Sequence, residues 1–219
     1  MGPSEGSYTS HAEAVHKVLN SAGYQHIHPE GVVELCCGVA FDSKGFPSQA
    51  ERKTEELQKA LLKASNNGEY PILCETSPCV QRLNHELSEL PIYDPVSFAG
   101  KFLIDQLELQ QLEETVVIHP TCSNRKAWHV AKMQVIAEKC AQEVVLPHTV
   151  TCCGTAGDRG IFHPELPEKA LNSLRSQIPK NCSLGISNSR TCELGLSMVS
   201  GVKFESMFHL LLKASKPKN

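Results

Sequence analysis

Two doublets of adjacent cysteines, Cys36-Cys37-Gly38 and Cys152-Cys153-Gly154, are the residues of this chain best suited to chemistry. Each doublet is followed at a similar distance by a single cysteine, Cys79 in one case and Cys192 in the other. Neighbouring cysteines oxidised to each other would close a small, strained ring, whereas both sulfurs can face one metal ion or cluster from a tight turn. The pattern therefore predicts thiolate chemistry at a metal centre rather than a disulfide.

The overall composition argues against several classes of protein. Ten cysteines in 219 residues are too few for a disulfide scaffold, and no N-terminal stretch has the layout of a secretory signal. We therefore expect a reducing compartment, the cytoplasm or, in a eukaryote, the mitochondrial matrix. No apolar run approaches the roughly twenty residues of a membrane span, which predicts a chain that is soluble by itself. A net charge of -3 without a basic cluster argues against a nucleic-acid partner.

Short aliphatic runs alternate with longer amphipathic segments, a pattern typical of an α/β fold with a largely parallel sheet. We expect strands that are short enough to be buried at residues 32–35, 71–73, 115–119, 143–146 and 183–186. Helices are expected to cover the faces of the sheet at residues 11–22, 48–64, 97–109, 127–141, 167–177 and 206–214.

The order of these segments indicates two repeats in tandem. In each half a predicted helix leads to a strand and the strand leads to a doublet. A loop rich in glycine and charge comes next, then a helix, a short strand and the single cysteine. We therefore predict two cysteine-rich domains, residues 1–112 and 113–219, each a mostly parallel sheet flanked by helices.

In the second half, four cysteines follow three predicted strands: Cys122, Cys152, Cys153 and Cys192. Loops after the carboxyl ends of parallel strands share one edge of a sheet, so we expect these thiols to converge there. Four thiolates can hold a [4Fe–4S] cluster or a structural zinc, and residue type alone does not separate the two. The paired Cys-x-x-Cys knuckles of most zinc sites are absent.

Two further cysteines, Cys140 and Cys182, have no partner in the other repeat, and we expect them to be small buried hydrophobic residues. His119 lies three positions before Cys122. It could reach the metal centre, but a histidine at the end of a strand that bonds to a backbone group is the simpler interpretation.

Taken together, the cysteine segments resemble the tandem cysteine-rich, or CCG, domain at the C-terminus of FAD-linked D-lactate dehydrogenases. Similar domains occur in the iron–sulfur component of glycolate oxidases and, more distantly, in the cysteine-rich component of heterodisulfide reductases. The resemblance covers essentially the whole chain. The segments that carry it are residues 35–38, 43–45, 76–79, 119–123, 152–160, 164–166 and 189–193.

The resemblance implies iron–sulfur ligation, one or two [4Fe–4S] clusters being expected. Family members have a Cys-x-x-Cys where this chain has Thr76 and Ser189 in the first positions. We therefore expect four-thiolate ligation in the second half rather than a five-ligand, non-cubane cluster. In dehydrogenases of this type the upstream cysteine of the first set would lie just before Met1, which leaves the set formed by Cys36, Cys37 and Cys79 one ligand short.

Cys74 could replace the missing ligand of the first set. It lies five positions before Cys79, and we expect it within a strand, where a structural role is the simpler interpretation. The second cluster is therefore the firmer expectation of the two.

The function implied by the resemblance is electron transfer within a larger flavoenzyme. An FAD-binding dehydrogenase domain or subunit, outside this sequence, would oxidise a D-2-hydroxy acid such as D-lactate or glycolate, and this module would pass the electrons to a quinone or cytochrome. Contact with a membrane would be peripheral, through that partner. We expect no catalytic residue here. Backbone amides around Gly154 and Gly157, together with Arg159 and His119, are candidates for contacts that tune a cluster.

Two other classes of function stay open. A zinc-stabilised interaction domain would keep the same cysteines without a redox role. A heterodisulfide or thiol reductase would use them as reactants as well as ligands, with a disulfide substrate at a doublet.

Overall fold

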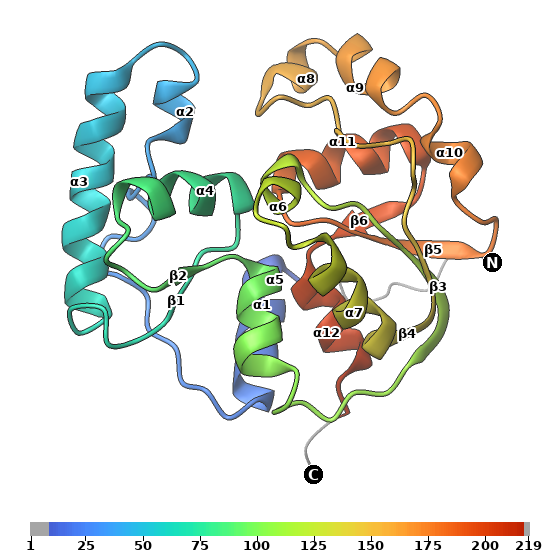
Figure 1. Cartoon of the computed structure of the whole chain (residues 1–219), viewed down its shortest axis with the longest axis horizontal. Helices are drawn as coiled ribbons and strands as arrows, with labels where there is room; N and C mark the ends of the chain where they lie inside the picture. The colour runs from blue at the N-terminus through green and yellow to red at the C-terminus, as the bar shows by residue number, and fades with distance from the viewer. Residues whose placement is uncertain (1–8, 217–219) are drawn as a thin grey trace.

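The computed structural model describes residues 9–216. It contains a two-stranded sheet, β1 (Ile72–Leu73) with β2 (Ile92–Tyr93), and a four-stranded sheet in the order β4-β3-β5-β6 (Figure 1). The strands of the larger sheet are β3 (Leu112–Ile118), β4 (Ala141–Val145), β5 (Cys182–Ile186) and β6 (Lys203–Glu205). All pairings between these strands are parallel, which confirms the predicted α/β class.

Helices connect the strands and surround both sheets. They are α1 (His11–Ser21), α2 (Val39–Asp42), α3 (Pro47–Ala64), α4 (Ser77–Glu86), α5 (Pro95–Phe98), the π-helix η1 (Ala99–Leu103), α6 (Cys122–Lys126), α7 (Val130–Cys140), α8 (Arg159–Phe162), α9 (Glu165–Ala170), α10 (Leu174–Gln177), α11 (Arg190–Ser200) and α12 (Met207–Ala214).

Local sequence explains where the longest helix begins and ends. Proline occupies the first position of α3, where its missing N–H costs no hydrogen bond. The helix ends before Asn66, Asn67 and Gly68, all three of which have positive φ, a conformation that asparagine and glycine tolerate.

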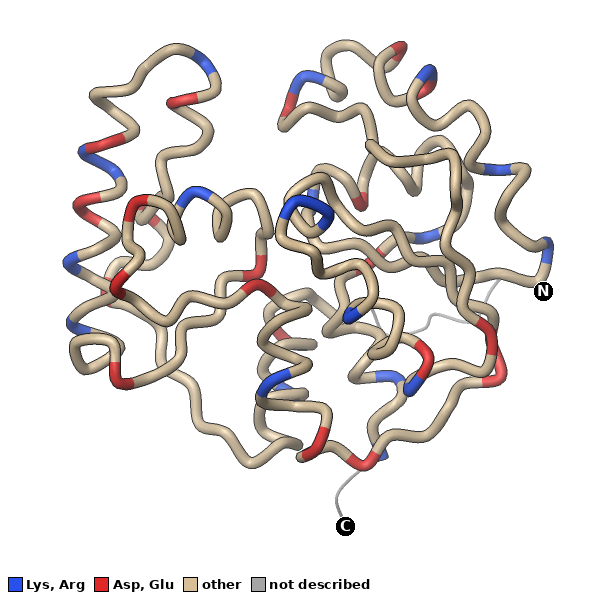
Figure 2. The backbone as a smooth tube through the Cα atoms, in the orientation of Figure 1, with Lys and Arg blue, Asp and Glu red and all other residues tan. Residues whose placement is uncertain are grey.

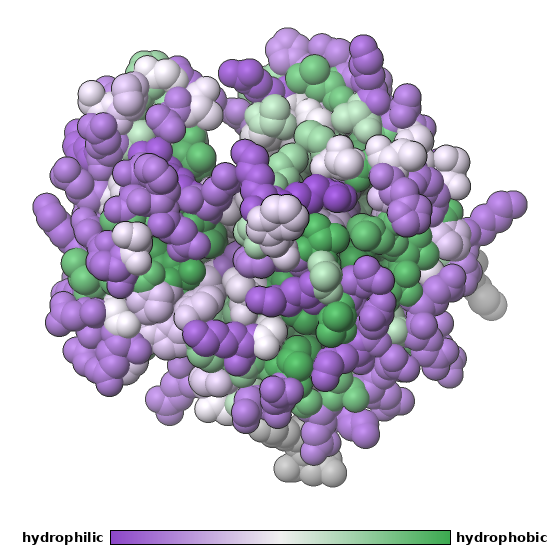
Figure 3. Space-filling model, in the orientation of Figure 1, coloured by the Kyte–Doolittle hydropathy of each residue, from purple (hydrophilic) through white to green (hydrophobic). Residues whose placement is uncertain are grey.

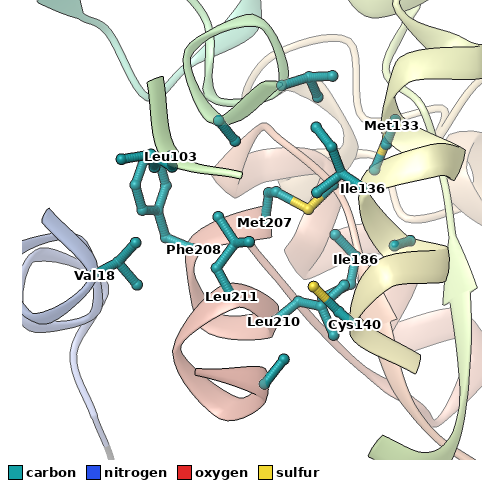
Figure 4. Packing of buried hydrophobic residues seen from close by; sticks show 14 of the residues in the cluster. Val18, Leu103, Met133, Ile136, Cys140, Ile186, Met207, Phe208, Leu210 and Leu211 are labelled. Atoms are coloured by element: carbon teal, nitrogen blue, oxygen red, sulfur yellow. The ribbon is translucent and has the colours of Figure 1, made fainter. Parts of the chain in front are cut away.

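The main hydrophobic core draws on both halves of the chain (Figure 4). Val18 of α1 and Leu103 of η1 belong to the same buried cluster as Met133 of α7, Ile186 of β5 and Phe208 of α12. Helix α1 packs directly on α12, although almost the whole chain separates them. The N-terminal helix is therefore part of the core around the larger sheet, and the division into domains 1–112 and 113–219 stays a prediction.

The predicted strand at residues 32–35 is wrong, because turns occupy this segment. Gly31 has a φ of +69°, and the Val33 side chain is 92 % exposed. A strand needs a neighbour for its backbone hydrogen bonds, and the small β1–β2 sheet does not extend to this segment. The first half therefore lacks the strand that precedes the doublet in the second half, and the described elements do not repeat one for one.

Other predicted boundaries also need correction. The helix predicted at 97–109 begins at Pro95 and ends as η1 at Leu103, because Asp94 caps its start and β3 needs an extended approach. The segment 167–177 forms two short helices, α9 and α10, instead of one. Helix α7 begins at Val130 because Trp128 has a φ of +59°. Strands β2 and β6 and helices α4 and α11 were not predicted.

Within residues 9–216, no helix combines the length and the apolar character needed to cross a membrane.

Candidate functional site

The four cysteines of the second half lie after the carboxyl ends of three adjacent parallel strands. Cys122 is the first residue of α6, which follows β3, and the doublet Cys152-Cys153 lies in the loop after β4. Cys192 is in the first turn of α11, which follows β5. Parallel strands direct these loops to one edge of the sheet.

The sulfurs of this set meet in two pairs. Cys153 Sγ and Cys192 Sγ are 2.8 Å apart and share a hydrogen bond. A disulfide would bring them to about 2.05 Å, so both are free thiols. When Cys153 loses its proton, the Cys192 thiol donates to the thiolate, which lowers the pKa of Cys153 to about 6 and raises that of Cys192. Cys152 and Cys122 form the other hydrogen-bonded pair, where burial is the main cause of a raised Cys122 pKa.

The two pairs differ in their exposure to solvent. Cys153 and Cys192 are 4 % and 9 % exposed, whereas Cys122 and Cys152 are exposed. We call Cys122, Cys152, Cys153 and Cys192 the second thiol site. One of its pairs therefore faces the core and the other faces outward.

Each doublet is held by the same backbone turn. The Gly154 N–H lies 3.4 Å from Cys152 Sγ, and the Gly38 N–H lies 3.4 Å from Cys36 Sγ. Both glycines have positive φ, +73° at Gly154 and +85° at Gly38. A Cβ at Gly38 would lie 2.5 Å from the carbonyl oxygen of Ala50, so the third residue of each Cys-Cys-Gly is required by both conformation and space.

Of the other residues predicted to tune a metal site, Gly154 contacts a thiol and two do not. Gly157 is exposed in the loop after the second doublet, and Arg159 is exposed at the start of α8. Sequence reasoning missed Thr155, whose Oγ1 lies 3.0 Å from Cys153 Sγ. Its position two residues after the doublet was the available signal, because a hydroxyl there can reach back to the turn.

The cysteines of the first half come from three segments of chain. Cys37 lies just before α2, Cys79 lies in the first turn of α4, and Cys74 is the first residue after β1. Cys79 Sγ is within hydrogen-bond reach of both Cys37 Sγ and Cys74 Sγ. We call Cys37, Cys74 and Cys79 the first thiol site. The Cys36 sulfur lies 3.4 Å from the Gly38 nitrogen and is not one of the sulfurs that Cys79 reaches. The expectation that Cys74 lies within a strand is wrong by one residue, because β1 ends at Leu73. Cys74 follows the strand and lies beside Cys79.

Cys140 lies in the main core, whereas Cys182 belongs to the same hydrophobic cluster as Cys153 and Cys192. Cys140 ends α7 in the main core and is 0 % exposed, and its pKa is raised to about 12 by burial. Cys182 begins β5, and burial also raises its pKa. Both fit the expectation of small buried hydrophobic residues.

His119 is 1 % exposed, at the end of β3 and three residues before Cys122. Within the described part of the chain neither ring nitrogen has a hydrogen-bond partner, and the Nε of the neighbouring Arg125 also has none. Burial, followed by the positive charge of Arg125, lowers the pKa of His119 to about 4. Among residues 9–216 the ring therefore forms no hydrogen bond to the backbone of another residue, and only an interaction with its own backbone acts to raise its pKa.

The lowered pKa of His119 predicts that the protein loses stability in mild acid. The unfolded chain takes up this proton near pH 6.5 and the folded chain only near pH 4, so stability is present above about 6.5 and falls as the pH drops between the two. Between pH 8 and pH 5 the loss from this residue is about 2 kcal/mol.

Urea unfolding of the metal-free, reduced chain at pH 8 and pH 5 measures this loss. His119→Leu should show about 2 kcal/mol less loss than the wild type. The control His85→Leu, at a histidine whose side chain is 85 % exposed, should lose as much as the wild type. An equally steep loss in His119→Leu would contradict the assignment.

A buried hydrogen-bond network joins the two thiol sites. Ser77, two residues before Cys79, donates through Oγ to the backbone oxygen of Asn188 at 3.1 Å and accepts from Ser123 Oγ at 2.8 Å. Ser123 directly follows Cys122. The two sites are thus connected by a fixed contact, which the sequence pattern did not predict.

The network continues to Asp94, which is 3 % exposed. Asp94 caps α5 by accepting the Ser97 N–H at 2.8 Å. Its other carboxylate oxygen accepts from Asn124 Nδ2 and pairs with His129 Nδ1 at 3.2 Å. Asn124 is 0 % exposed and also lies 3.0 Å from Thr121 Oγ1, so Asp94 connects the first half to the turn that carries Cys122.

The two loops after the doublets meet across a notch between α2–α3 and α8–α9 (Figure 3). Lys44 Nζ from the first loop lies 2.7 Å from Asp158 Oδ2 in the second, and this contact lowers the pKa of Asp158. Figure 2 shows Lys, Arg, Asp and Glu interspersed along the backbone, including at these two loops.

The cysteine sulfurs are the right kind of ligand for a zinc ion or an iron–sulfur cluster, but the distances between them do not match such a site. Two thiolates on one tetrahedral zinc lie about 3.8 Å apart, because each Zn–S bond is about 2.3 Å. The Cys153 and Cys192 sulfurs are closer, at 2.8 Å, and would have to separate by side-chain rotation. In the described segment 9–216, no group of three or more His, Cys, Asp or Glu side chains is arranged so that it could hold a metal ion directly.

Comparison with known proteins finds no family model that matches the chain and no curated protein that matches its sequence.

Proposed function

We propose that this chain is the iron–sulfur electron-transfer module of an FAD-dependent D-2-hydroxy-acid dehydrogenase, acting on D-lactate or glycolate and delivering electrons to a quinone or cytochrome. The observation that carries the proposal is the pairing of thiols from separate loops: Cys153 with Cys192 and Cys122 with Cys152 in the second half, and Cys79 with Cys37 and Cys74 in the first. Scattered structural cysteines have no reason to meet in this way. The cluster, when bound, supplies one-electron oxidation and reduction.

The surroundings of the second thiol site support the same function. Burial of Cys153 and Cys192 would keep water from the inner ligands. The N–H of Gly154 and the hydroxyl of Thr155 each lie near a sulfur of the doublet. Hydrogen bonds to ligand sulfurs and exclusion of water are the means by which a protein sets the potential of such a centre. The exposed pair, Cys122 and Cys152, gives the site a face toward redox partners.

One observation favours a second candidate, thiol–disulfide exchange at Cys153 and Cys192. A thiolate with a pKa of about 6 could attack a disulfide, and the neighbouring thiol could displace the resulting mixed disulfide. The two thiols would give up two electrons and end as a disulfide, while the substrate would become two thiols. Both sulfurs are buried, however, and a disulfide substrate must reach the attacking sulfur. We therefore favour ligation over exchange.

Anaerobic reconstitution of the whole chain with iron and sulfide tests the proposal. We expect a brown protein with about four iron atoms and four sulfides per loaded site and a paramagnetic signal after reduction. A colourless protein with stoichiometric zinc would instead support the zinc-stabilised domain. A chain that takes up no cluster and reduces glutathione disulfide over many turnovers with an added reductant would support the exchange chemistry. Either outcome would overturn the proposed function.

A further inference from the structure

We propose that the His119 ring and the Arg125 guanidinium bind a small monovalent anion, of the size of chloride or formate, at the carboxyl end of β3. The site lies between the end of β3, helix α6 and the loop that leads to the second doublet. It involves no metal ion, so the inference does not depend on the proposed function.

His119 and Arg125 carry buried polar atoms without partners. Among residues 9–216, both ring nitrogens of His119 and the Nε of Arg125 have no hydrogen-bond partner. The Arg125 guanidinium makes one hydrogen bond, from Nη2 to the Val150 carbonyl oxygen at 3.4 Å, and no carboxylate of the described chain pairs with it. Buried polar groups normally have partners, and an unpaired charge is costlier to bury than a neutral group, so these atoms indicate a bound ligand.

The other buried side chains with unpartnered atoms do not need a ligand. They are His11 and Glu75, whose Nε2 and Oε1 lie 2.8 Å apart, so each faces the other. For His119 and Arg125, by contrast, the described part of the chain supplies no acceptor for the free N–H groups.

The geometry of β3 directs the His119 ring toward the same segment that Arg125 contacts. The His119 N–H donates to the Ile186 carbonyl oxygen at 2.8 Å, so strand pairing continues to this residue. Side chains two residues apart on a strand share a face, and Val117 packs in the hydrophobic cluster that contains Val150. The ring therefore lies on the side of the sheet where the Val150 carbonyl oxygen accepts from Arg125.

The charges at this place call for one negative charge. Burial, followed by the positive charge of nearby Arg125, lowers the pKa of His119 to about 4, so the ring is neutral at pH 7 and has one N–H to donate. The guanidinium keeps its charge and donates through Nε. A monovalent anion would balance this charge and accept from both donors. A ring that is 1 % exposed can be reached only by an ion of few atoms.

A water molecule is the alternative occupant. Water accepts from the same two donors, but it leaves the partly buried charge of Arg125 without a counterion. An anion would in addition connect the end of β3 to α6, the helix that begins with Cys122.

Titration of the reduced, metal-free chain with sodium formate tests the proposal at neutral pH. The nuclear magnetic resonance signal of the Arg125 Nε–H is the readout, and sodium gluconate, a larger anion, keeps the ionic strength constant. We expect a saturable shift with one site per chain, and a similar shift with sodium chloride. The increase in melting temperature that formate causes, relative to gluconate, then measures binding in variants.

The variants are Arg125→Met and His119→Phe, with Arg159→Met as the control because Arg159 is exposed on α8. Loss of a charge-assisted hydrogen bond should weaken formate binding about tenfold in the first two and leave the control like the wild type. Circular dichroism shows whether each variant is folded. His119→Phe and the wild-type titration decide the question if Arg125→Met does not fold.

Two results would overturn the anion site. One is equal stabilisation by formate in the wild type and in a folded Arg125→Met or His119→Phe. The other is an Arg125 Nε–H signal that moves in neither salt, which would assign the site to water.

Discussion

If the proposed iron–sulfur centre forms at the second thiol site, Cys192→Ser is expected to remove it, with a loss of about four iron atoms per chain and of the corresponding paramagnetic signal. Among the proposed ligands of this site, Cys192 is the one that α11 supplies, and its sulfur lies 2.8 Å from that of Cys153. A serine hydroxyl is a poor replacement for a thiolate, because its proton is far harder to remove. Iron and sulfide analysis with paramagnetic resonance of the reduced protein measures the effect.

The matched control for this variant is Cys140→Ser. Cys140 is as deeply buried as Cys192 but lies in the main core, apart from both thiol sites. It should keep the wild-type iron content and signal, although a buried hydroxyl costs stability. An unchanged signal in Cys192→Ser would refute its assignment as a ligand, and equal losses in both variants would attribute the effect to damage of the fold.

Asp94→Ala is expected to lower the free energy of unfolding of the metal-free chain by about 3 kcal/mol. Loss of the cap of α5 accounts for about 1 kcal/mol. The rest comes from Asn124, which is 0 % exposed and would lose the partner of its amide nitrogen, because an unsatisfied buried donor costs about 1–3 kcal/mol. Urea unfolding at neutral pH under reducing conditions measures the change.

Asp105→Ala is the control for this prediction, since Asp105 is exposed on the segment that follows η1. Its effect should stay within about 0.5 kcal/mol. If Asp94→Ala were as mild as the control, the buried network would not be a stabilising link between the halves. Because the network reaches Ser77 and Ser123, beside Cys79 and Cys122, we also expect weaker retention of iron by the folded variant.

The pattern of apolar residues was sufficient to predict the fold class and three strands of the larger sheet. The aliphatic runs at 115–119, 143–146 and 183–186 correspond to β3, β4 and β5, because a buried central strand must be apolar on both faces. The run at 32–35 looked equally suitable, and it failed because a strand also needs a neighbour to receive its hydrogen bonds. A short apolar run carries no information about whether that neighbour exists.

The features that residue types and spacing specify are local. The doublets need glycine after them because the turn that holds the first sulfur has positive φ and little space, and parallel strands send the following loops to one edge. The remaining features depend on how the chain packs. Cys74 joins Cys79, His119 is buried without a partner among the described residues, and Asp94 reaches Asn124, because these contacts join segments that pack together only in the folded chain. The spacing of residues along the sequence does not reveal which distant segments will pack together, so these contacts could not be predicted.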